Sequence, residues 1–286
     1  MKIKVKNLIL TIIAIYLVVF IIFIYFGQPI MLFRPWHDED AYNSLKKYEE
    51  IGLVNEIIVK NSFGENLHGW IIYNNSKEEK SPTILYYLPN MGNSSNLVNL
   101  LITTNKLKYF EGYNMLVVDY PGYGLSEGRP KEKNILDTGT TLYNYAVSLD
   151  CTDKDNIVIM SYSIGTGVAT YVASQKDVTG LVLIAPYDEF LSIANGVLNI
   201  FHGPLKYLKR FDFKSNEYAE KVTVSPLVFT STGDKLIKKS YTDRLMNHFN
   251  SVEKIIVFDG IGHNDYFAKK EMYDEIYNYL QKRLIN

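Results

Sequence analysis

The sequence has almost no cysteine, no excess of charge of either sign and no repeated block. Cys151 is the single cysteine of the 286 residues, so one chain can form neither a disulfide framework nor a zinc site built on cysteines. Lysine and arginine total 30 against 31 aspartate and glutamate residues. This balance leaves no basic excess to neutralise phosphates and argues against a nucleic-acid partner. The lack of repeats excludes solenoids and propellers.

The segment Leu8–Phe26 contains no charged residue, and Thr11 is its only member that is not apolar. As a helix it would rise roughly 28 Å, close to the ~30 Å thickness of the hydrocarbon layer of a bilayer. The competing interpretation is a cleaved signal peptide, which usually has a shorter apolar stretch and a small-x-small cleavage site. Residues 27–31 offer no such site. The sequence therefore predicts an uncleaved transmembrane helix.

The charges that flank this segment predict its orientation. Lysines stand at positions 2, 4 and 6 before it, whereas Arg34 after it is followed by acidic residues at 38–40. The positive-inside rule then keeps the short N-terminus in the cytoplasm and carries the rest of the chain across the membrane. We expect residues 1–34 to be the anchor and residues 35–286 to form one domain on the extracytoplasmic side.

From Val54 onward, short apolar runs alternate with stretches of helical spacing. Short runs rich in valine and isoleucine, typical of strands buried on both faces, occupy residues 83–88, 115–120, 156–160, 181–185, 226–230 and 254–258. Stretches with helical spacing lie between them, at residues 96–109, 132–149, 165–175, 239–249 and 267–284. Before them, 54–60 and 67–73 flank a turn and predict an antiparallel hairpin. The alternation predicts an α/β fold whose mostly parallel sheet has helices on both faces, with ligands bound at the carboxyl ends of its strands.

Residues 187–224 form a long insertion between two of the predicted strands. Connections in α/β units are usually 2–6 residues long, so this apolar-rich stretch is more than a turn. Two interpretations remain open: a helical hairpin that packs on the sheet, or a short helical lid that lines an acyl-binding pocket.

The run 156–160 leads directly into Ser161-Tyr162-Ser163-Ile164-Gly165. This is the pattern of a nucleophile elbow, with Ser161 where the first glycine usually stands. The turn is strained, and we expect its small residues at 161 and 165 to be needed because they pack against each other. Ser163 is therefore the predicted nucleophile, and its hydroxyl needs a neighbouring base.

His263 is the predicted base, because it alone of the five histidines follows a predicted buried strand and precedes a helix. An acid must then orient the imidazole and stabilise its charged form. Asp234 directly follows the strand 226–230 and is the favoured acid. Asp188, at the end of the strand 181–185, is the rival that the sequence leaves open.

Two main-chain N–H groups are expected to stabilise the oxyanion of an acyl-transfer reaction. The first belongs to Ile164, the residue after the nucleophile at the start of a helix. The second is expected in the loop after the strand 83–88. Pro89 has no N–H group, so Asn90 is the candidate donor and Met91 the reserve.

Together these motifs resemble those of serine hydrolases of the α/β-hydrolase superfamily, in particular its membrane-anchored esterase and thioesterase-like group. That group has Phe/Tyr-x-Pro after its hydrophobic segment, here Phe33-Arg34-Pro35. Its oxyanion loop corresponds to Leu88–Asn93, where Leu88-Pro89 replaces a His-Gly pair. Its Asp-Tyr-x-Gly-Tyr-Gly-x-Ser-x-Gly segment matches residues 119–128, and its Gly-His-Asn-Asp motif matches 262–265. The chain order Ser, Asp, His also agrees with the superfamily.

The resemblance implies an α/β-hydrolase fold and a hydrolase that cleaves a carboxylic ester or thioester through an acyl-enzyme. The implied triad is Ser163, Asp234 and His263, with Asn90 and Ile164 as oxyanion donors and with neither a cofactor nor a metal. The insertion and the anchor favour an acyl or lipid-like small-molecule substrate. The altered oxyanion loop keeps an inactive, membrane-tethered binding module as an alternative, and a serine peptidase on the same triad is a third.

Overall fold

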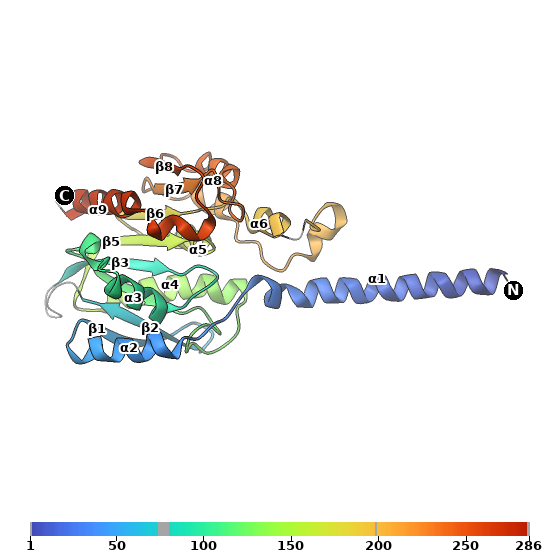
Figure 1. Ribbon diagram of the computed structural model, residues 1–286, viewed down its shortest axis with the longest axis horizontal. Coiled ribbons are helices and arrows are strands. Elements are labelled where there is room, and N and C mark those ends of the chain that lie inside the picture. Colours follow the sequence, from blue (N-terminus) through green and yellow to red (C-terminus); the bar gives the residue numbers. More distant parts are fainter. Residues whose placement is uncertain (1, 74–79, 198, 285–286) are drawn as a thin grey trace.

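A long helix projects from a rounded α/β domain in this computed structural model, which describes residues 2–73, 80–197 and 199–284 (Figure 1). The helix, α1 (Lys2–Leu32), carries its apolar side chains exposed along most of its length. Its segment Lys4–Pro29 is long and apolar enough to cross a membrane. Only near its last turns do Ile24 and Gln28 become buried against the domain.

An eight-stranded sheet in the order β1-β2-β4-β3-β5-β6-β7-β8 forms the centre of the domain. The strands are β1 (Val54–Lys60), β2 (Asn66–Ile72), β3 (Ser81–Tyr87), β4 (Asn114–Val118), β5 (Thr152–Tyr162), β6 (Gly180–Ile184), β7 (Leu227–Ser231) and β8 (Lys254–Phe258). β2 pairs antiparallel with β1 and β4, and the pairings from β4 through β8 are parallel. Every residue of β4 and β6 is buried, as their continuous apolar runs predicted. The predicted hairpin and the mostly parallel sheet are thus confirmed.

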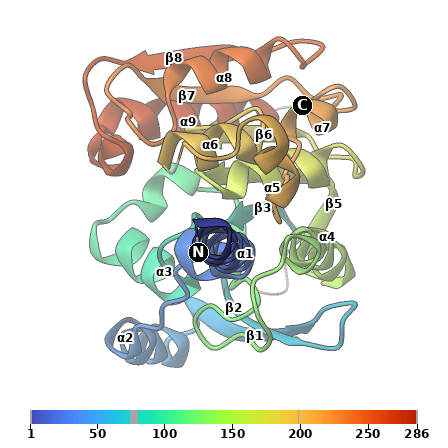
Figure 2. The ribbon, with the colours of Figure 1, turned by 90° about the vertical axis from the view of Figure 1, so that its right-hand side faces the viewer.

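Helices cover both faces of this sheet, as predicted. The main ones are α2 (Glu39–Glu50), α3 (Ser94–Thr103), α4 (Glu132–Ser148), α5 (Gly165–Ala173), α8 (Lys239–Met246) and α9 (Lys270–Leu284). α2, α3 and α9 lie on one face and α4 and α5 on the other, while α8 packs beside β7 (Figure 2). The hydrophobic core therefore lies on both sides of the sheet.

Two helix predictions need correction, and one helix was not predicted. The single helix expected over 96–109 ends at Thr103, because Asn105 takes a left-handed conformation (φ 53°) before the short helix η1 (Leu107–Phe110). The helix expected over 267–284 begins at Lys270 as α9, directly after the short helix η3 (His263–Ala268). Helix α2 was not expected, although the side chain of Asp38 caps it by accepting a hydrogen bond from the N–H of Ala41 at 2.9 Å.

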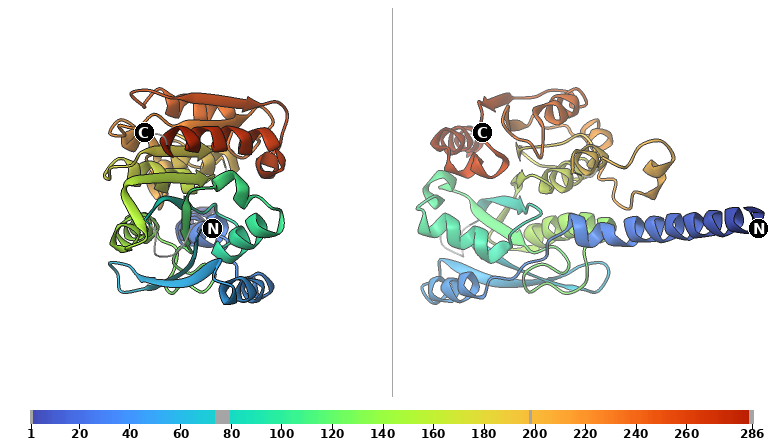
Figure 3. Two further views of the ribbon diagram at one scale, coloured as in Figure 1. Left: turned by 90° about the vertical axis from the view of Figure 1, so that its left-hand side faces the viewer. Right: turned by 45° about the vertical axis from the view of Figure 1, so that its right-hand side comes forward.

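The insertion 187–224 contains α6 (Phe190–Val197), η2 (Gly203–Leu208) and α7 (Ser215–Ala219). It extends out of the domain on the side from which α1 leaves (Figures 1 and 3). Gln28 joins the two, because its amide nitrogen donates to the carbonyl of Leu208 at 2.8 Å and its amide oxygen accepts from the N–H of Arg210 at 2.9 Å. The carboxyl ends of the parallel strands point to this same side (Figure 1).

Candidate active site

Ser163 occupies a sharp turn between β5 and α5. Its φ of 57° is a left-handed conformation that non-glycine residues rarely adopt and that functional sites often hold. The turn is fixed by the N–H of Ser163, which donates to the carbonyl of Ile184 in β6 at 2.9 Å. The elbow expected from the sequence is therefore present, at the carboxyl end of a central strand.

The structure gives a further reason for the glycine that follows Ser163 at position 165. A Cβ on Gly165 would lie 2.4 Å from the carbonyl oxygen of Tyr87 and 2.6 Å from that of Leu88, so its closest neighbours belong to the end of β3 and not to Ser161. The hydroxyl of Ser161 instead faces the carbonyl of Val182 in β6 at 3.5 Å.

The structure brings the side chains of Ser163, His263 and Asp234 into one line of hydrogen bonds. The Oγ of Ser163 lies 2.9 Å from Nε2 of His263, and Nδ1 of the same ring lies 2.7 Å from Oδ2 of Asp234. These contacts join the loops after β5, β8 and β7. In this geometry one imidazole nitrogen is available to exchange a proton with the hydroxyl while the carboxylate fixes the orientation of the ring.

The loops that carry Asp234 and His263 approach each other closely. A Cβ on Gly233 would lie 2.4 Å from the main-chain carbon of Gly260, so glycine at 233 lets the two loops touch. The other carboxylate oxygen of Asp234, Oδ1, accepts from the N–H groups of Leu236 at 2.9 Å and Ile237 at 2.8 Å. Asp234 is buried, and the main chain of its own loop holds its carboxylate.

Asp188, the rival acid, has a different partner. Its Oδ2 lies 2.6 Å from Nε of Arg244 in α8, and this ion pair ties the insertion to that helix. The imidazole of His263 thus contacts Asp234 and not Asp188.

Two tyrosines contact the side chains of this site, and neither was predicted from the sequence to belong to it. The Oη of Tyr162 donates to the main-chain carbonyl of His263, and its ring stacks on the imidazole with centroids 5.0 Å apart. The Oη of Tyr266 donates to Oδ2 of Asp234 at 3.3 Å. Burial and the charge of Asp234 raise the pKa of both phenols, so both stay protonated donors. Tyr162 lies inside the elbow motif, which was its only signal in the sequence.

A cleft of about 630 Å³ opens beside Ser163. It is lined by the elbow, the loop after β3 and the loops of the acid and the histidine: Pro89, Asn90, Met91, Tyr162, Ser163, Gly233, Lys235, Leu236, Gly260, Gly262, His263 and Asn264. Asn90 thus lines the cleft. Ile164 occupies the N-cap position of α5, directly after Ser163. Over the described residues, no three histidine, cysteine, aspartate or glutamate side chains group as metal ligands.

Hydrogen bonds connect the loop of Asn90 to the residues that follow the C-terminal end of α1. The side-chain oxygen of Asn90 accepts a hydrogen bond from Oη of Tyr123 at 2.9 Å, and the same phenol oxygen accepts one from the N–H of Arg34 at 3.2 Å. The side chain of Asn93 donates to the carbonyl of Trp36 at 3.3 Å. Residues directly after α1 therefore contact the predicted oxyanion loop and Tyr123, which is bonded to it.

Comparison with known proteins gives a family, two relatives and a solved structure. The family model of the alpha/beta hydrolase fold matches residues 63–240. An uncharacterized protein of Mycobacterium tuberculosis is 25% identical over 73% of this chain and 72% of its own. An uncharacterized membrane protein of Saccharomyces cerevisiae is 28% identical over 82% and 79%. A solved esterase of Pyrococcus furiosus has a TM-score of 0.62 at 16% identity, covering 81% of this chain and 91% of that one, a likeness of fold alone.

Proposed function

The chain belongs to the alpha/beta hydrolase family, and on this premise we propose that it is a serine hydrolase that cleaves carboxylic esters or thioesters through an acyl-enzyme. Family membership supports hydrolase activity in general. The observation that supports the narrower proposal is the hydrogen-bonded line from the hydroxyl of Ser163 through His263 to Asp234. A serine hydroxyl is a weak nucleophile on its own, and this arrangement is one that activates it.

In the proposed reaction, Oγ of Ser163 attacks the carbonyl carbon while Nε2 of His263 takes the hydroxyl proton. Asp234 accepts the hydrogen bond from Nδ1 and stabilises the imidazolium. His263 then returns the proton to the leaving oxygen or sulfur as its bond to the carbonyl carbon breaks. Water, deprotonated by the same imidazole, then attacks the acyl carbon. The bond to Oγ of Ser163 breaks, the imidazolium returns its proton to Oγ, and the acid is released.

The main-chain N–H groups of Ile164 and Asn90 are the proposed oxyanion donors. Ile164 begins the first turn of α5, where N–H groups have no partner within the helix and favour negative charge. Asn90 lines the same cleft as Ser163. A donor of this kind is typically worth about 2.7–4 kcal/mol of transition-state stabilisation.

The proposed substrate is an acyl or lipid-like ester presented near a membrane. The exposed apolar surface of α1 and the yeast relative's description as a membrane protein suggest membrane association. We assign residues 1–34 to a single-pass anchor with a cytoplasmic N-terminus, and residues 35–286 to a hydrolase domain across the membrane. In this proposal the insertion 187–224 acts as a lid, and its hydrogen bonds to Gln28 support a position close to the bilayer.

Labelling with a fluorophosphonate probe tests the proposal directly. The detergent-solubilised full chain is expected to be labelled, and the variant Ser163→Ala is expected to lose all label. Ser161→Ala is the matched control, because this buried serine lies two residues away and its hydroxyl faces β6. A folded wild-type protein that takes up no label would overturn the proposal and favour the inactive binding module.

A series of p-nitrophenyl esters of increasing acyl length, run beside thioesters and dipeptide amides, tests the substrate class. We expect ester or thioester turnover to exceed amide turnover. Faster turnover of the amides would favour a peptidase.

A further inference from the structure

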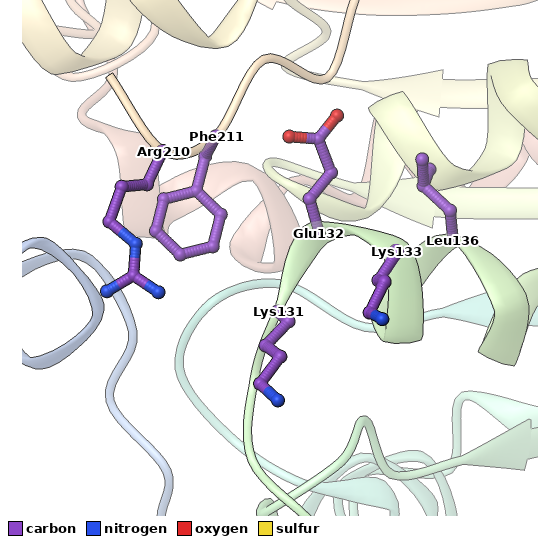
Figure 4. A pocket seen from close by; sticks show the side chains of 6 residues that line it. All are labelled: Lys131, Glu132, Lys133, Leu136, Arg210 and Phe211. Atoms are coloured by element: carbon purple, nitrogen blue, oxygen red, sulfur yellow. The ribbon is translucent and has the colours of Figure 1, made fainter. Parts of the chain in front are cut away.

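Apart from the active-site cleft, the domain has a pocket of about 370 Å³ between the start of α4 and the segment that follows η2 (Figure 4). Its walls include three cationic side chains, Lys131, Lys133 and Arg210. Leu136 and Phe211 supply apolar wall. The pocket therefore combines positive charge with apolar surface.

The one acidic side chain in the wall is already engaged by the protein. Glu132 is partly buried and accepts hydrogen bonds from the main-chain N–H groups of Asp212 and Phe213. Within the ranges that the structure describes, none of the three cations is ion-paired with a carboxylate. Three cations stand beside one carboxyl group in this wall, and one of them, Lys133, also lies over the ring of Phe63 at 4.8 Å. The wall therefore has an excess of positive charge, which suits an anionic ligand.

The position of the pocket along α1 is set by two contacts. The guanidinium carbon of Arg210 lies 5.1 Å from the ring centroid of Tyr25, which belongs to the last turn of the apolar segment. The main-chain N–H of Arg210 is bonded to Gln28, less than one turn further along α1. The pocket therefore lies where the apolar surface of α1 ends, which is the level of the lipid headgroups if α1 spans a bilayer.

The neighbouring side chains have the composition of a membrane interface. Tyr207 in η2 is 77% exposed and Leu205 beside it is also exposed. Lys206 lies over the ring of Tyr207 at 5.1 Å. Tyrosines with lysines and arginines are enriched at the membrane–water boundary, where an apolar ring and a charged group are both satisfied. η2 extends from the domain on the side of α1 (Figures 1 and 3).

We infer that the pocket lined by Lys131, Lys133 and Arg210 binds the anionic headgroup of a phospholipid in the leaflet next to the domain. The cations hold the phosphate, and the acyl chains continue along the exposed apolar side chains of α1. This is a second membrane contact in addition to the anchor. It depends on α1 lying in a membrane and does not depend on catalysis.

Native mass spectrometry of the full chain in detergent micelles tests this inference. Dioleoylphosphatidylglycerol is expected to bind more tightly than the zwitterionic dioleoylphosphatidylcholine. A cation near an anionic lipid surface is worth about fivefold in affinity. The triple variant Lys131→Gln, Lys133→Gln, Arg210→Gln is therefore expected to lose most of the preference. The double variant Lys131→Gln, Lys133→Gln changes only exposed side chains and is expected to lose about 25-fold.

The matched control is the triple variant Lys80→Gln, Lys108→Gln, Lys154→Gln. It removes the same charge near the amino ends of β3, β4 and β5, whereas the pocket lies on the side of their carboxyl ends. It is expected to keep the lipid preference, and so is Ser163→Ala. Equal binding of the two lipids by the wild type, or equal losses in both triple variants, would overturn the inference. Competition by soluble glycerol phosphate at the affinity of the lipid would overturn it as well, because the ligand would then be a free anion.

Discussion

Tyr162 contacts His263 twice, through a hydrogen bond from its phenol to the main-chain carbonyl and through stacking of its ring on the imidazole at 5.0 Å. The residue directly before Ser163 therefore supports the ring that faces the hydroxyl of Ser163. Since Tyr162 is the last residue of β5 and His263 the first of η3, this contact limits how far the start of η3 can move from the end of β5. Tyr162 is thus a positioning residue for the proposed reaction.

Replacing Tyr162 with phenylalanine keeps the stacked ring and removes the hydroxyl. We expect kcat for an ester to fall about 5- to 30-fold, because a lost hydrogen bond of about 1–2 kcal/mol leaves the carbonyl of His263 without its donor. KM is expected to change little, because phenylalanine keeps the ring that lines the cleft and loses only the hydroxyl that is bonded to the carbonyl of His263.

Tyr113→Phe is the matched control, since this buried phenol also donates to a main-chain carbonyl, that of Leu280 at 2.9 Å, but far from Ser163. It is expected to lower thermal stability and leave kcat unchanged. Equal losses of kcat in both variants would argue against a positioning role for Tyr162.

Asp234→Asn is expected to lower kcat by about 10³- to 10⁴-fold, because an amide no longer stabilises the imidazolium and favours the wrong tautomer. Asp188→Asn is the comparison, since its carboxylate pairs with Arg244 instead. It is expected to keep kcat within a few-fold of wild type and to lower the melting temperature slightly. Steady-state kinetics on a short-chain ester measures both, and the opposite ranking would transfer the acid role to Asp188.

Gly165→Ala is expected to destabilise the protein by about 1–3 kcal/mol or more, because its Cβ would meet two carbonyl oxygens at the end of β3. Thermal unfolding measures this loss. Gly196→Ala is the control, since this exposed glycine lies in α6 and the nearest atom to a Cβ is the flexible Oη of Tyr241 at 3.1 Å. A Gly165→Ala variant as stable as the control would mean that the elbow is not tightly packed against β3.

Burial raises the pKa of Glu132 above its ordinary value of 4.5. The folded state then favours the neutral carboxyl, so the stability that this group contributes is present below pH 4.5 and is lost as the pH rises through the raised pKa. Glu132→Gln does not titrate and is expected to remove this fall. Urea unfolding between pH 4 and 7 measures the difference, and the exposed Glu50→Gln is expected to leave the pH dependence as it is in wild type. A wild-type stability that rises over this range relative to Glu132→Gln would contradict the prediction.

Much of the fold follows from local patterns in the chain. Continuous apolar runs identify strands such as β4 and β6 because burial on both faces leaves no room for polar alternation. Helix ends were less predictable, since a single residue such as Asn105 interrupts an otherwise helical pattern by taking a positive φ. Helix α2 was not predicted, although its two buried residues, Ala41 and Leu45, stand four residues apart, which is helical spacing.

The sequence alone determined the chemistry that is available: one serine in an elbow, one histidine after a strand, and two candidate acids, Asp234 and Asp188. Their catalytic roles stay predictions, as do the lid and the orientation of the anchor. Only the tertiary structure showed that His263 contacts Asp234 while Asp188 pairs with Arg244, and only it brought Tyr162 and Tyr266 next to these side chains. The reason is that hydrogen bonds depend on distances between loops that are far apart in sequence. Such distances are set by how strands pair and helices pack, and no local pattern of residues records them.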